Sequence, residues 1–134
     1  MSDSSDIVVL RTARGSLALP VLRVFISGVA SRHDLPVDRL DDVQLAVETL
    51  LADEPGGEGD LLLEISAGSG GLTLRLAGLL NQSVRSALLA TDLFQPREGC
   101  PLDVRVLLDS LLDGYQVMDG ENESFVVEME KRAS

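Results

Sequence analysis

The stretch from Asp38 to Pro55 sets the strongest requirement on the fold. Its apolar residues recur at the three- and four-residue spacing of a single helix face: Leu40, Val43, Val47, Leu50 and Leu51. Asp38 and Asp41 place negative charge in the first turn, where the helix dipole favours it, and Pro55 followed by two glycines ends the helix. Because its apolar face is narrow, this helix must pack against a second layer of structure.

The rest of the chain predicts that second layer. A strand is expected at 7–13 and a helix at 19–31, and the alternating segments 61–67 and 72–77 flank a Gly-Ser-Gly-Gly turn as an antiparallel hairpin. A short helix at 83–90, a helix that starts near Pro101, and a last hairpin of 115–118 with 124–131 follow. This order predicts an α+β two-layer sandwich, with helices on one face of a mixed, mostly antiparallel sheet.

Length and composition indicate one folded domain. The chain has 134 residues, 45% of them hydrophobic, which suffices for a core without disulfides or metals. We expect residues 1–6 to form a disordered tail and 7–132 to form the domain. The connection 78–101 is long enough to be a functional lid, a binding loop or a mobile insert.

Charge and cysteine usage restrict the partners and the compartment. A formal net charge of −11 argues against binding to nucleic acid and favours a basic protein partner or simple solubility. No apolar run approaches the roughly 18 residues of a membrane span, and the acidic start MSDSSD lacks the pattern of a secretory signal. Together with the single Cys100, these features predict a cytoplasmic protein.

No set of side chains has the spacing of a catalytic or metal site. One histidine and one cysteine cannot build a typical zinc site, and neighbouring acidic residues of a helix point about 100° apart. Glu48 is singled out because it falls on the border of the apolar face, where a carboxylate can face a cleft beside the core. The alternative is that Glu48 is one more solubilising surface charge.

Three segments together resemble the anti-sigma factor serine kinases, which are small members of the GHKL ATPase superfamily with the Bergerat fold. The segments are LPVDRLDDVQLAVETLL (35–51), GLTLRLAG (71–78) and VLLDSLLDGYQV (106–117). The resemblance extends from about residue 7 to residue 132. It implies the fold of histidine-kinase-like ATPases and a role in transcription regulation, such as stress response.

The first two nucleotide-binding motifs of that family are incomplete in this chain. The first motif is Glu-x-x-x-Asn, in which Glu acts as the base and Asn holds Mg²⁺; here Glu48 is retained but Ala52 replaces Asn. The second is Asp-x-Gly-x-Gly, in which Asp recognises adenine; here Leu76 and Leu80 replace Asp and the second glycine, and only Gly78 is retained. A methyl group cannot ligate a cation that requires oxygen ligands.

The third motif, whose glycines let backbone N–H groups approach the phosphates, falls at Leu102 and Val104. Side chains at these positions obstruct that approach. The resemblance with these departures therefore implies that Glu48 is a vestigial general base and Gly78 a vestigial nucleotide contact. We expect no bound cofactor and no metal.

The preferred interpretation is an anti-sigma-factor-like regulatory protein that acts by exchange of protein partners. The implied partners are a sigma factor, an anti-anti-sigma factor or both, with homodimers common in the family; the candidate polar contacts are Arg11, Arg14, Arg23 and Arg32. The alternative is an active ATP-dependent serine/threonine kinase that uses ATP and Mg²⁺, with Glu48 as base and Asp53 as a substitute metal ligand. A third interpretation is a structural subunit that binds neither sigma factor nor nucleotide.

Overall fold

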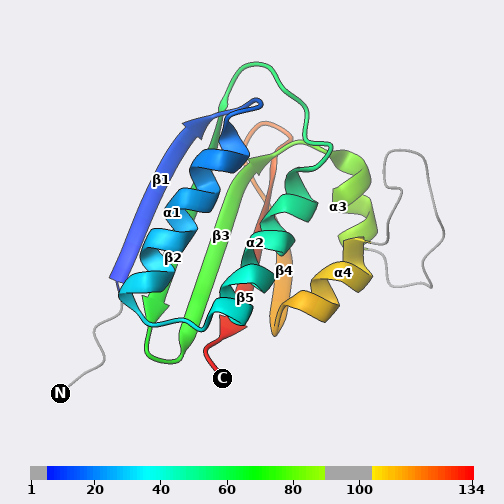
Figure 1. The fold of residues 1–134 in the computed structure, drawn as a ribbon. Helices are drawn as coiled ribbons and strands as arrows, with labels where there is room; N and C mark the ends of the chain where they lie inside the picture. Colours follow the sequence, from blue (N-terminus) through cyan, green and yellow to red (C-terminus); the bar gives the residue numbers. More distant parts are fainter. Residues whose placement is uncertain (1–5, 90–103) are drawn as a thin grey trace.

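The computed structural model describes residues 6–89 and 104–134, which form five strands and four helices (Figure 1). In chain order these are β1 (Asp6–Ala13), α1 (Ala18–Arg32), α2 (Val37–Leu51), β2 (Asp60–Gly68), β3 (Gly71–Leu79), α3 (Gln82–Leu89), α4 (Val104–Leu111), β4 (Gly114–Asp119) and β5 (Phe125–Arg132). The order matches the one expected from the sequence. The described part of the chain is therefore an α+β fold.

The five strands form one sheet in the order β1-β2-β3-β5-β4, in which every neighbouring pair is antiparallel. The prediction of a mixed sheet is therefore wrong for the described strands. α1 and α2 run in opposite directions, so together they bring the chain back to the end of the sheet where β1 finishes. β2 therefore starts at that end and runs opposite to β1 (Figure 1). β3 and β4 do run in the same direction, but β5 lies between them.

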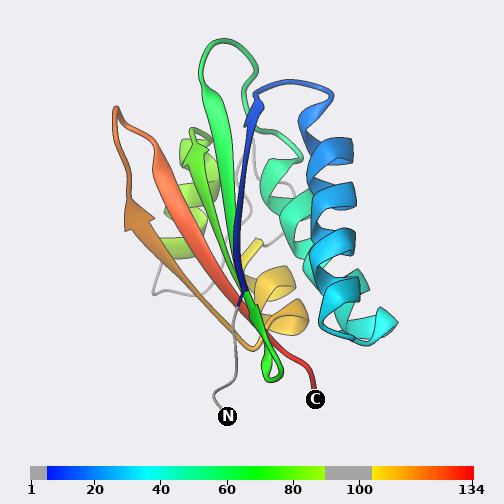
Figure 2. The same ribbon diagram turned by 90° about the vertical axis from the view of Figure 1, so that its left-hand side faces the viewer.

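Strand alternation sends apolar side chains to one face of the sheet, as expected. Leu63 of β2, Leu74 of β3 and Val127 of β5 are fully buried there, whereas Arg75 on the other face is exposed. α1, α2 and α4 cover the apolar face, and α3 packs beside α4 and β4 (Figure 2). None of the described helices covers the opposite face, which we call the open face. The two-layer arrangement is thus confirmed.

Some strands and helices begin or end at residues other than the expected ones. β1 begins at Asp6 instead of Ile7, and residues 1–5 lie outside the described residues. α2 ends at Leu51, four residues before Pro55. Leu102, Cys100 and the second half of the expected 78–101 connection lie outside the described residues, whereas residues 78–89 include the end of β3 and the helix α3. No described helix is both long and apolar enough to cross a lipid bilayer.

Lys131, the only lysine of the chain, continues the inward alternation of β5 and is buried. Its Nζ donates a hydrogen bond to the carbonyl of Leu111 at 2.6 Å and pairs with Asp42 Oδ2 at 3.0 Å. The carbonyl belongs to the last residue of α4, where the helix dipole favours a cation. One ammonium group thereby joins α2, α4 and β5.

Asp113 holds the turn between α4 and β4 against β5. Its backbone N–H donates to the Glu130 carbonyl at 3.0 Å, and its Oδ2 accepts the backbone N–H of Arg132 at 2.6 Å. That hydrogen bond is the main reason that the pKa of Asp113 lies below 3.8. The charges of Lys131, Arg132 and Arg39 lower the pKa further, and partial burial opposes them.

We expect the free energy of unfolding of an Asp113→Asn variant to fall less steeply with decreasing pH than that of wild type. Because the pKa is lower in the folded state, ionised Asp113 stabilises the fold above the unfolded-state pKa, and this contribution is lost as pH falls through the folded-state value. Urea unfolding at a series of pH values below about pH 4 measures the effect. Asp109→Asn removes an exposed carboxylate of the preceding helix α4 and is the control. Equal slopes for wild type and D113N would contradict the prediction.

Candidate functional site

A pocket of about 450 Å³ lies where the N-terminal end of α1 meets the C-terminal end of α2. Arg14, Ala18 and Leu61 contribute from the β1–α1 and β2 sides, and Glu48 and Ala52 contribute from α2 and the residue after it. The pocket therefore contains two positions of the expected first motif.

Glu48 lines this pocket. Its Oε2 lies 3.1 Å from Nη1 of Arg23 on α1, and the two side chains are 45% and 48% exposed. One turn earlier, Gln44 donates to the Arg23 carbonyl at 3.1 Å and to Ser27 Oγ at 3.0 Å. Glu48 thus belongs to a row of polar contacts that joins α1 to α2. In this structure its carboxylate is engaged by a guanidinium.

Ala52 presents only a methyl group to the pocket at the position where a metal ligand is expected. Asp53, the proposed substitute ligand, is exposed and does not line the pocket. Its carbonyl accepts a hydrogen bond from the Asn81 side chain at 3.2 Å. In the described residues, no three His, Cys, Asp or Glu side chains group as a metal site.

The second expected motif lies on β3 and does not share the pocket with Glu48. Leu76 points inward and is fully buried in the core. Gly78 has φ of +92° at a bulge of β3, and a Cβ atom there would lie 2.5 Å from the Asp60 carbonyl oxygen. The local backbone therefore requires glycine at 78, whether or not a nucleotide binds.

Other positions of the second and third expected motifs are also used by the fold. The backbone N–H of Leu80 donates to the carboxylate of Glu54, at 2.9 Å to Oε2 and 3.1 Å to Oε1. Val104 begins α4 and is buried. Leu102 lies outside the described residues.

Glu54 is the centre of a buried polar group that we call the Arg14–Glu54 cluster, made of Arg14, Glu54, Gly78, Leu80 and Asn81. Arg14 Nη1 lies 2.5 Å from Glu54 Oε2, and both side chains are only 4% exposed. Arg14 Nη2 donates to the Gly78 carbonyl at 2.5 Å, and the Asn81 backbone N–H donates to Glu54 Oε1 at 3.2 Å. The carboxylate thus accepts hydrogen bonds from a guanidinium and two backbone amides.

This cluster corrects one expectation and adds a residue that the sequence did not reveal. Arg14 was a candidate for a surface contact, but its burial against Glu54 makes it unavailable to a partner. The two residues are 40 positions apart, and no local pattern links them. The Arg14–Glu54 cluster forms part of the pocket wall, because the side chains of Arg14 and Glu54 both line the pocket.

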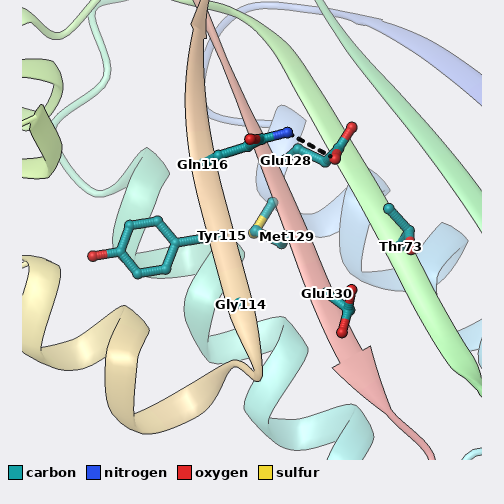
Figure 3. A pocket seen from close by; sticks show the side chains of 7 residues that line it. All are labelled: Thr73, Gly114, Tyr115, Gln116, Glu128, Met129 and Glu130. Carbon is teal, nitrogen blue, oxygen red and sulfur yellow. Dashed lines mark hydrogen bonds between the residues drawn. The ribbon is translucent and has the colours of Figure 1, made fainter.

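A second, shallow hollow of about 290 Å³ lies on the open face over β3, β5 and β4 (Figure 3). Thr73, Gln116, Glu128 and Glu130 give it a polar surface, and Gln116 donates to Glu128 at 3.2 Å. The ring of Tyr115 points away from these polar groups (Figure 3).

Comparisons with known proteins do not assign the chain. Its sequence matches no model of a protein family, and a search of the curated proteins finds no match either.

We expect Glu54→Ala to destabilise the protein by about 3–5 kcal/mol. The substitution leaves a buried guanidinium and two backbone N–H groups without their acceptor, which costs far more than the loss of an exposed ion pair. The free energy of unfolding in urea measures the loss.

The exposed ion pair of Arg23 with Glu48, which lines the same pocket, provides a matched control. Glu48→Ala removes the partner of Arg23, but both side chains are nearly half exposed, so a change within about 1 kcal/mol is expected. If both variants lost a similar amount of unfolding free energy, the buried Arg14–Glu54 cluster would stabilise the protein no more than the exposed ion pair does.

Proposed function

We propose that this protein is an anti-sigma-factor-like regulatory protein that acts by binding other proteins and has lost nucleotide binding. The proposal rests on the resemblance over residues 7–132. The α+β two-layer fold, with its helices on one face of the sheet, is compatible with it. The expected partners are a sigma factor, an anti-anti-sigma factor or both.

The main support for loss of the nucleotide site is Leu76. The family uses an aspartate at this position to recognise adenine, whereas Leu76 packs in the core and offers no hydrogen bond. Ala52 lacks a metal ligand, and the Leu80 amide already donates to Glu54. Each lost contact is worth roughly 1–3 kcal/mol, so several losses weaken a micromolar site to millimolar or beyond.

The alternative of an active kinase has less support. It requires Glu48 to act as a base and Asp53 to replace the missing asparagine. In the structure the Glu48 carboxylate is paired with Arg23, and Asp53 does not line the pocket that Glu48 borders.

Titration calorimetry with Mg-ATP tests the nucleotide part of the proposal. We expect no binding heat up to millimolar nucleotide, because the adenine, metal and phosphate contacts are lost together. Binding in the micromolar range would overturn this part and would favour the kinase, which a phosphorylation assay would then test.

Co-purification with sigma factors tests the partner part. The resemblance implies that the first helix contributes to the contact, and Arg23 is its exposed basic residue beside Glu48. We expect Arg23→Glu to weaken capture of a sigma factor at least tenfold. The double variant Arg23→Glu with Glu48→Arg restores the internal ion pair but reverses the surface charge, so it should remain defective.

Two outcomes would contradict this assignment. Recovery of binding in the double variant would mean that Arg23 acts only by holding α1 to α2. Failure of the wild-type protein to capture any sigma factor or anti-anti-sigma factor would favour the structural-subunit interpretation.

A further inference from the structure

The pocket between α1 and α2 has the size and the lining of a small-molecule site. Its volume of about 450 Å³ lies within the roughly 300–1,000 Å³ that is usual for such sites. Five apolar residues line it: Ala18, Leu19, Leu51, Ala52 and Leu61. Ala18 and Leu61 are almost fully buried, so the core holds this part of the wall in place. The pocket therefore offers a preformed apolar surface to a ligand.

This pocket is separate from most of the nucleotide contacts that the family resemblance implies. α2 lies between α1 and α4 in the helical layer, and the pocket is on the α1 side of α2 (Figure 1). The second expected motif lies on β3 and the third includes the start of α4, and neither Leu76 nor Val104 lines the pocket. A ligand held here would thus lack the adenine and phosphate contacts of a nucleotide.

The first turn of α1 contains an N–H group without an acceptor. The helix begins after Leu17, which makes no side-chain cap, and its first turn has no acidic residue. The N–H of Ala18 donates to the Gly15 carbonyl at 3.1 Å, and Pro20 has no N–H. Leu19, which lines the pocket, has no acceptor for its N–H among the described residues. The positive end of this helix dipole is therefore uncompensated.

A second donor at the same pocket also lacks a partner. Arg14 lines the pocket with a side chain that is only 4% exposed. Its Nη1 and Nη2 donate to Glu54 and to the Gly78 carbonyl, but its Nε is buried and has no hydrogen-bond partner among the described residues. A buried donor without an acceptor is unfavourable and is rare in folded proteins. A side chain and a helix end thus independently call for an acceptor here.

The carboxylates of the pocket wall do not supply that acceptor, because guanidinium groups already engage them. Glu54 pairs with Arg14 through Nη1, and Glu48 pairs with Arg23 at 3.1 Å. An anionic ligand would therefore meet paired carboxylates in the wall, even though the chain as a whole has a net charge of −11. The chemistry of the pocket favours an oxygen acceptor joined to an apolar body.

We propose that this pocket binds a small monocarboxylic acid with an apolar body. The carboxylate lies at the N-terminal end of α1, where the Leu19 N–H and the Arg14 Nε–H supply the donors. The apolar body packs against Leu51, Ala52 and Leu61. This site does not depend on the proposed function, since it requires neither a sigma factor nor a nucleotide.

Hexanoate, hexan-1-ol and hexylamine test the head group, because they share one apolar body and differ in charge and hydrogen bonding. NMR titration of the full isotope-labelled chain measures their binding. We expect hexanoate to bind with a Kd in the millimolar range, as is usual for a ligand of so few atoms, and to shift the amide signals of Leu19 and Ala52. Hexan-1-ol and hexylamine should bind at least tenfold more weakly.

Ala52→Leu tests the location of the site, since a larger side chain there fills part of the pocket. We expect it to weaken hexanoate binding at least tenfold. Asp53→Leu is the matched control, because Asp53 is the exposed neighbour and does not line the pocket. Neither residue belongs to the Arg14–Glu54 cluster, so both variants should fold as wild type does.

Three results would overturn the proposal. The first is the absence of hexanoate binding at concentrations well above the millimolar range. The second is equal or tighter binding of hexan-1-ol or hexylamine, and the third is an equal loss of affinity in the two leucine variants. Titration with Mg-ATP and capture of a sigma factor are separate measurements, so failure of the proposed function would leave this assignment standing.

Discussion

The buried ion pair of Arg14 and Glu54 is the interaction on which the end of the sandwich depends. It connects the segment after β1 with the segment after α2, and through Gly78 and Leu80 it reaches the last residues of β3 and the approach to α3. Burial makes each charge costly by itself, so the arrangement persists only while both partners and both backbone amides are present. Four chain segments are thereby held to one geometry.

The same cluster explains several local features together. α2 ends before Pro55, so Glu54 is free to turn its carboxylate toward Arg14. At the bulge of β3, the carbonyl of Gly78 accepts a hydrogen bond from the guanidinium of Arg14. A carboxylate of the chain itself thus occupies the N–H groups of Leu80 and Asn81, so these amides are not free to meet an external anion.

Much of the fold could be predicted from the sequence because periodicity reports which side of an element is buried. The alternation of Leu72, Leu74 and Leu76 fixed the inner face of β3, and the helical spacing of Val43 and Val47 fixed that of α2. The all-antiparallel pairing could not be predicted, since the position of β5 between β3 and β4 depends on contacts distant in sequence. The pairing of Arg14 with Glu54 was missed for the same reason. For Glu48, the sequence predicted a position at the border of the apolar face but not the guanidinium of Arg23 that engages it.

Burial of Lys131 has a consequence for the chemistry of the chain. Its ammonium is the only lysine amine, and hydrogen bonding to Leu111 and pairing with Asp42 remove it from solvent. Reagents and enzymes that modify lysine side chains therefore meet their single target only when α2, α4 and β5 separate. The rate of acylation at Lys131 becomes a direct measure of how often this part of the helical layer opens.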